Sequence, residues 1–239
     1  MTGDRNKLPG EPATRTAVEA FLERLAAAPA ARPTPGRRGR LMFALDATAS
    51  RQPTWDQACH IQAEMFKETA ALGGLDIQLA FYRGYGEFKA SAWLNSAADL
   101  LKHMSAVSCL GGKTQIGRVL RAAIDETKRA KIDAVVFVGD CMEEDADKLC
   151  HRAGELGLLG VPVFLFHEGS DRRAAEAFQE IARLTRGAYC PFDAGSARQL
   201  RELLSAVAVY AAGGPAALQD YSRRAGGATL LLARQVARP

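Results

Sequence analysis

The sequence lacks any long apolar run and any close pairing of cysteines. Its apolar segments fall well short of the about 18 residues that a membrane-spanning helix needs. The first residues contain no apolar stretch typical of a secretory signal. The five cysteines are an odd number and none forms a CxxC pair, which argues against a disulfide framework and a zinc ribbon. We therefore expect a reduced protein of the cytoplasm with no membrane partner.

Excess charge is also missing from most of the chain. The first 40 residues hold eight Lys or Arg and four Asp or Glu, so the whole formal net charge of +4 lies there. The basic stretch RPTPGRRGR at 32–40 is compatible with a nucleic-acid arm or with a solvated linker. Its four arginines are few for an electrostatic footprint on a nucleic acid. We favour the linker and expect no nucleic-acid partner.

What the sequence does contain is a regular alternation of strand and helix patterns. Strands are expected at 41–46, 76–82, 133–140, 161–168 and 188–193, with a short edge strand at 87–93. Helices are expected at 14–28, 55–72, 97–104, 116–129, 143–158, 172–186 and 196–212. This alternation predicts an α/β fold of the doubly wound kind, with a mostly parallel central sheet, helices on both faces and one short antiparallel edge strand.

Prolines and glycines divide the chain into three parts. Residues 1–39 are expected to form an N-terminal helix and a linker rich in proline and arginine. Residues 40–212 carry the strand and helix alternation and form the central domain. Two glycines open the remaining segment, 213–239, which is interpreted as a C-terminal appendage. We expect the central domain to fold without either end.

Oxygen-bearing side chains follow the first buried strand on alternate residues. The stretch LMFALDATAS ends with Asp46, Thr48 and Ser50, and a later strand ends with Asp140. In doubly wound folds, ligands bind beyond the carboxyl ends of the strands, at the point where the strand order reverses. These residues also include preferred capping types, so an alternative is that they cap the helix expected to begin near Pro53.

The pattern resembles a known family at three places in the chain. Asp46, Thr48 and Ser50 are similar to the D-x-S-x-S signature of the von Willebrand factor A family, with threonine in place of the first serine. Thr114, in a glycine-rich loop, matches the next signature, and Asp140 matches the aspartate that ends the fourth strand. The resemblance covers roughly residues 40–210. It implies a Rossmann-like fold and a metal-ion-dependent adhesion site for Mg²⁺ or Mn²⁺ on these five residues.

The chemistry of such a site follows from its ligands. Hard divalent cations take oxygen ligands. Three neutral hydroxyls would contact the cation, and the resemblance implies that Asp46 and Asp140 act partly through bound water and hydrogen bonds. A shell rich in neutral hydroxyls leaves the cation able to accept a carboxylate from another molecule. Cys141 stands where the family has a glycine after the last aspartate, and it is expected to narrow the mouth of the site.

These features favour a binding module over an enzyme. The expected partner is a protein that supplies an Asp or Glu to the metal, and the resemblance implies AAA+ ATPases or chaperones as partner classes. The alternative is a metal-dependent phosphatase or phosphotransferase of the haloacid-dehalogenase type. That chemistry usually needs a second acid two residues after the nucleophile, where this chain has Thr48.

Three further motifs are interpreted as structural. The sequence GGKT at 111–114 is not a P-loop, because the first glycine of that motif would fall at Val107. His167 precedes Glu168 at the end of a strand and has no evident catalytic partner. The acidic run at 143–147 could tune a cation or repel acidic partners, but acids in the first turn of a helix also offset its macrodipole, and we favour that interpretation.

Overall fold

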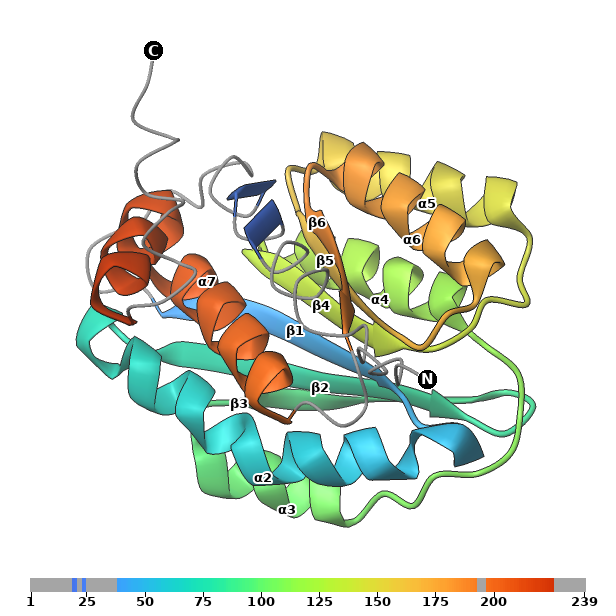
Figure 1. Cartoon of the computed structure of the whole chain (residues 1–239), viewed down its shortest axis with the longest axis horizontal. Helices are drawn as coiled ribbons and strands as arrows, with labels where there is room; N and C mark the ends of the chain where they lie inside the picture. The colour runs from blue at the N-terminus through green and yellow to red at the C-terminus, as the bar shows by residue number, and fades with distance from the viewer. Residues whose placement is uncertain (1–18, 21–22, 25–37, 193–196, 226–239) are drawn as a thin grey trace, which may run out of the picture.

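Six strands form one sheet in the computed structural model, which describes residues 19–20, 23–24, 38–192 and 197–225. The strands are β1 (Gly39–Asp46), β2 (Leu75–Arg83), β3 (Glu87–Leu94), β4 (Ala134–Gly139), β5 (Val163–Glu168) and β6 (Ala188–Phe192). Their order in the sheet is β3-β2-β1-β4-β5-β6. All neighbours are parallel except β3, which pairs antiparallel with β2 at one edge. The fold class predicted from the sequence is confirmed (Figure 1).

Helices cover both faces of this sheet. They are η1 (Ala49–Arg51), α2 (Gln52–Thr69), η2 (Ala70–Leu72), α3 (Ala97–Ser105), α4 (Ile116–Arg129), α5 (Ala146–Leu158), α6 (Arg172–Thr185) and α7 (Ala197–Ala225). Figure 1 shows α2, α3 and α7 on one face and α4, α5 and α6 on the other. Most of the helix expected at 14–28 lies outside the described residues, although residues 19–20 and 23–24 are helical.

The alternation of side chains along β1 explains the two layers. Leu41 and Phe43 belong to the core cluster that includes α2, α3 and α7. Met42 and Ala44 belong to the cluster that includes α4, α5 and α6. A strand buried on both faces has this continuous apolar sequence because successive side chains point to opposite sides. Within the described part of the chain, no helix is long and apolar enough to cross a membrane.

The reversal of strand order places the predicted site. β1 is hydrogen-bonded to β2 on one side and to β4 on the other, and both pairings are parallel. The chain therefore winds away from β1 in two directions. In doubly wound folds the ligand crevice lies at such a reversal, which here falls above the carboxyl ends of β1 and β4. Asp46 is the last residue of β1, and Asp140 directly follows β4.

The last helix, α7, consists of two helical segments. The first ends at a kink at Gly214, whose φ of 71° and ψ of −168° are not helical, close to the predicted end at residue 212, and the second continues to Ala225. Beyond the kink, Leu218 packs in the same core cluster as β1 and α2. The division of the chain at residue 212 remains a prediction, and Leu218 offers a way to test it.

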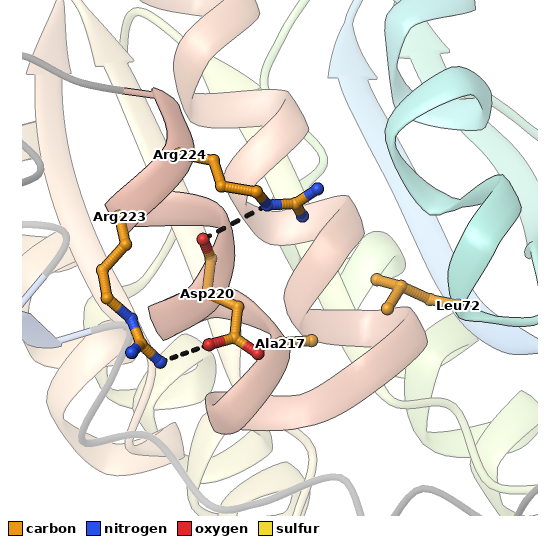
Figure 2. Close-up of a pocket in the computed structure, with 5 residues that line it drawn as sticks. All are labelled: Leu72, Ala217, Asp220, Arg223 and Arg224. Atoms are coloured by element: carbon orange, nitrogen blue, oxygen red, sulfur yellow. Dashed lines mark hydrogen bonds and ion pairs between the residues drawn. The ribbon is translucent and has the colours of Figure 1, made fainter.

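A pocket of about 390 Å³ lies beside this second segment of α7. Figure 2 shows its lining side chains, which are Leu72, Ala217, Asp220, Arg223 and Arg224. Arg223 pairs with the Asp220 carboxylate, and the Arg224 Nε donates to the Asp220 carbonyl at 3.4 Å. Leu72 lies just before β2 begins, so this pocket is near the amino ends of the strands, away from the predicted site.

Leu218→Ala should lower the free energy of unfolding by about 2–5 kcal/mol, the usual cost of emptying a filled core position. Leu218 is 1% exposed. Urea unfolding of the full chain measures the effect. Leu158→Ala is the matched control, because Leu158 is 92% exposed and should change stability by no more than about 0.5 kcal/mol. Equally small effects of both substitutions would mean that the segment after Gly213 is an appendage.

Candidate functional site

Asp46 carries a buried carboxylate at the end of β1. The residue is 2% exposed. Its Oδ1 accepts the backbone N–H of Thr48 at 2.7 Å, and its Oδ2 accepts the hydroxyl of Tyr82 at 3.0 Å. Burial raises the pKa of Asp46 to about 6, the hydrogen bonds from Thr48 oppose this rise, and the charge of Asp140 adds to it. The site therefore holds a negative charge that has little contact with water.

Ser50 connects the loop after β1 to the end of β4. Its hydroxyl donates to Asp140 Oδ2 at 2.8 Å, and it lies 3.5 Å from the hydroxyl of Thr48. The other oxygen of Asp140, Oδ1, is buried and has no hydrogen-bond partner among the described residues. Four of the five predicted site residues are thus joined by direct contacts in the crevice above β1 and β4.

The alternative that these side chains cap a helix does not agree with the structure. Thr48 precedes η1 and Arg51 precedes α2, yet neither helix start has a side-chain capping hydrogen bond in the described part of the chain. The hydroxyl of Ser50 donates to Asp140, which follows a different strand, and does not cap the helix that begins beside Ser50. Asp46 does orient its loop locally, by accepting the N–H of Thr48.

Thr114, the fifth predicted residue, is bonded to a different loop. Its N–H donates to Glu143 Oε2 at 3.1 Å, and its Oγ1 accepts the N–H of Glu143 at 3.0 Å. The loop that carries Thr114 is still tied to the rest of the site. The N–H of Leu110 donates to the carbonyl of Ala47 at 3.0 Å, just after Asp46. The structure thus joins the two loops but shows Thr114 bonded to Glu143.

The acidic run at 143–147 serves two helices. Asp145 caps α5 by accepting the N–H groups of Asp147 and Lys148, so part of the run stabilises α5 as predicted. Glu144 instead accepts the N–H groups of Ile116 at 2.5 Å and Gly117 at 3.0 Å, at the start of α4. Burial raises the pKa of the Glu144 carboxyl, and these backbone N–H groups oppose the rise. The sequence pattern assigned Glu144 to the start of α5, whereas its carboxylate bonds to the start of α4. The sequence could not predict this, because α4 and α5 become neighbours only in the folded chain.

A buried ion pair beside the site was missed by the sequence analysis. Arg51 is 5% exposed, and its Nη1 lies 2.5 Å from Glu168 Oε2 while its Nε lies 3.6 Å from Asp140 Oδ2. The hydroxyl of Thr54 donates to the same oxygen of Glu168. Arg51 directly follows the predicted signature and Glu168 ends β5, so only the strand order brings them together.

His167 and Cys141 lie next to the loop after β4. The Nε2 of His167 is 3.1 Å from the carbonyl oxygen of Asp140, and its Nδ1 is 2.9 Å from the hydroxyl of Tyr189. Burial lowers the pKa of His167, so the ring is neutral near pH 7 and supports the backbone at residue 140. Burial, followed by the charges of Asp140 and Asp46, raises the pKa of the Cys141 thiol to about 12, so this thiol stays protonated.

The side chains in the crevice fit a hard divalent cation. They offer carboxylate and hydroxyl oxygens, which are the ligands that Mg²⁺ and Mn²⁺ prefer. The buried Oδ1 of Asp140 has no hydrogen-bond partner among the described residues, and burial raises the pKa of Asp46. A nearby cation would stabilise both carboxylates. In the described ranges, no group of three or more His, Cys, Asp or Glu side chains could hold a metal. A metal in this crevice would therefore depend on the hydroxyls of Thr48, Ser50 and Thr114.

Comparison with solved structures identifies the fold, although no family model and no curated protein matches the chain. A von Willebrand factor type A protein from Catenulispora acidiphila aligns with a TM-score of 0.59 at 16% identity, over 70% of this chain and 42% of that one. The SpRpn10 VWA domain aligns with a TM-score of 0.54 at 13% identity, over 74% of this chain and 98% of that domain. Proximal thread matrix protein 1 from the mussel byssus, with a zinc-occupied MIDAS motif, aligns with a TM-score of 0.55 at 14% identity, over 72% of this chain and 46% of that one. This chain has the von Willebrand factor A fold.

Proposed function

We propose that this chain is a metal-dependent protein-interaction module. Thr48, Ser50 and Thr114 would hold one Mg²⁺ or Mn²⁺, and Asp46 and Asp140 would support it. The observation that carries the proposal is the buried Oδ1 of Asp140, which lacks a hydrogen-bond partner in the described part of the chain although its Oδ2 is bonded to Ser50. A buried charged oxygen left without a partner is costly, and a bound cation with its water would satisfy it.

The ligand type supports recognition of an acidic side chain. The hydroxyls carry no charge, so the two aspartates supply the negative charge that balances a divalent cation. An Asp or Glu of a partner protein is then a suitable further ligand, because Mg²⁺ takes a near-octahedral set of oxygens. The neighbour with a zinc-occupied MIDAS motif supports a divalent metal at this place in the fold. AAA+ ATPases and chaperones of the cytoplasm remain the partner classes that the family resemblance suggests.

The surroundings of Asp46 favour binding over catalysis. A phosphotransferase of the haloacid-dehalogenase type uses its first aspartate as a nucleophile. Here both oxygens of Asp46 are engaged, one by the N–H of Thr48 and one by the hydroxyl of Tyr82. The position of the second acid is filled by Thr48, a buried threonine. No observation in the described residues favours the phosphatase alternative.

Thr114→Val should weaken Mn²⁺ binding by about 10-fold or more, because it removes one hydroxyl ligand and keeps the side-chain shape. Calorimetric titration of the full chain with Mn²⁺ measures the affinity. Thr127→Val is the matched control on the last turns of α4, where the hydroxyl of Thr127 is buried without a hydrogen-bond partner among the described residues. Equal Mn²⁺ affinity of Thr114→Val, Thr127→Val and the native chain would remove Thr114 from the site.

The same variants separate the two functions. A partner held by the native chain in Mg²⁺ should be released by EDTA and should not bind Thr114→Val. A partner that stays bound in EDTA would contradict the carboxylate mechanism. Metal-dependent hydrolysis of p-nitrophenyl phosphate, lost in Asp46→Asn, would replace the binding proposal with the phosphatase.

A further inference from the structure

A guanidinium occupies the interior of the crevice, next to the proposed metal position. Arg51 is enclosed between the ends of β4 and β5, where its Nη1 meets Glu168 and its Nε meets Asp140. Its Nη2 donates to the carbonyl of Ser50 at 3.3 Å and to the hydroxyl of Thr54 at 3.4 Å. Removing such a charge from water is costly unless it is paired. The two carboxylates therefore hold Arg51 in place.

The ion pairs of Arg51 are unequal. The distance to Glu168 Oε2 is 2.5 Å, whereas the distance to Asp140 Oδ2 is 3.6 Å. Both nitrogens are buried and face these oxygens without hydrogen-bond geometry. Glu168 is thus the main ion-pair partner of Arg51, and Asp140 is a second, more distant partner. Asp140 is also the residue whose Oδ1 remains without a partner among the described residues.

We propose that Arg51 is a built-in counter-ion of the metal site, which holds Asp140 in place when no metal is bound and lowers the affinity for a divalent cation. This inference rests on the proposed function. A cation near Asp140 is repelled by the guanidinium, and because Arg51 is buried this repulsion is screened less than that between two surface charges. The carboxylate of a partner adds a negative charge at the same place and offsets the repulsion. Metal and partner should therefore each strengthen binding of the other.

Opposite effects of two substitutions test this arrangement. Arg51→Met leaves the charge of Glu168 exposed to the site, so Mn²⁺ should bind about 10-fold more tightly in calorimetry of the full chain. Glu168→Gln leaves the charge of Arg51 unbalanced, so Mn²⁺ should bind about 10-fold more weakly. The double variant restores the balance and should lie within about 3-fold of the native chain. Arg51→Lys keeps the charge and should also remain near the native affinity.

Thermal unfolding gives a second readout. In EDTA, Arg51→Met should unfold at a lower temperature than the native chain, since it leaves a buried carboxylate unpaired. Saturating Mn²⁺ should raise its unfolding temperature by more than it raises that of the native chain. If Arg51→Met does not fold, Glu168→Gln still tests the sign of the effect, because it has nearly the same shape and can keep its hydrogen bond with Thr54.

The outcomes distinguish this inference from the proposed function. If the native chain binds Mn²⁺ and both single variants bind it equally well, Arg51 only stabilises the loops. The same conclusion follows if both single variants bind Mn²⁺ more weakly. The metal site would then stand without the counter-ion. Failure of the native chain and of every variant to bind Mn²⁺ would overturn both ideas together. Tightening in Arg51→Met with weakening in Glu168→Gln supports the counter-ion.

Discussion

Asp46→Asn is expected to weaken metal binding strongly and, at the same time, to make the metal-free chain more stable near pH 7. The first effect follows from the loss of a buried negative charge next to the hydroxyl ligands, and we expect a fall in Mn²⁺ affinity on the order of 100-fold. The second follows from the cost of that charge when no cation is present. An asparagine has nearly the same size and can accept the N–H of Thr48, as Asp46 does.

The sign of the stability change follows from the pKa of Asp46. Burial raises it from 3.8 to about 6, so the folded chain binds this proton more tightly than the unfolded chain does. Between about pH 4 and pH 6 the stability of the metal-free protein therefore falls as pH rises, by about 3 kcal/mol in total for this group. Asp46→Asn lacks this loss. We expect it to be about 1–3 kcal/mol more stable above pH 7 and to show no advantage near pH 4.

Urea unfolding in EDTA, at several pH values, measures the difference between the native chain and Asp46→Asn. Asp145→Asn is the control, because Asp145 lies in the neighbouring loop and an asparagine can cap α5 equally well. It should change neither Mn²⁺ affinity nor stability by a measurable amount. If Asp46→Asn were less stable than the native chain at pH 7 in EDTA, the carboxylate of Asp46 would stabilise the fold of the metal-free protein.

The sheet could be predicted from the sequence because its signals are local. The continuous apolar run of β1 and the helical pattern of α4 each depend only on near neighbours in the chain, and residues 116–129 are the observed bounds of α4. The segment after the kink in α7 was predicted less well. Glycines at 213 and 214 and Pro215 do mark the end of the first helical segment, close to residue 212, but a second helical segment follows and its Leu218 packs in the core.

The site shows where such local reasoning ends. Asp46, Ser50 and Asp140 could be predicted to meet, since strand order brings the ends of β1 and β4 together and a family pattern marks the residues. Arg51 and Glu168 carry no such mark. Their pairing depends on which side chains face each other across the crevice, and a buried arginine has the same sequence appearance as an exposed one. The partners of Glu144 were missed for the same reason.

Gly112→Ala is expected to disrupt the site through the backbone alone. A Cβ on Gly112 would lie 2.0 Å from the carbonyl oxygen of Gly84, in the turn between β2 and β3. That contact cannot be relieved by a side-chain movement, since the obstructing atoms belong to the backbone. The same carbonyl accepts the N–H of Lys113 at 3.1 Å and the side-chain amide of Gln115 at 3.4 Å. Pushing the two loops apart would break these bonds on either side of Thr114.

We expect Gly112→Ala to lower the free energy of unfolding by about 1–3 kcal/mol, the usual cost of overpacking, and to weaken Mn²⁺ binding by about 10-fold or more as Thr114 is displaced. Gly111→Ala is a closely matched control, because a Cβ on the adjacent Gly111 would have no heavy atom within 4 Å. It should leave both quantities close to native. Urea unfolding and Mn²⁺ calorimetry on the two variants measure the contrast. If Gly112→Ala lost stability but kept its metal affinity, metal binding would not depend on the contact between these two loops. That result would argue against Thr114 as a ligand of the metal.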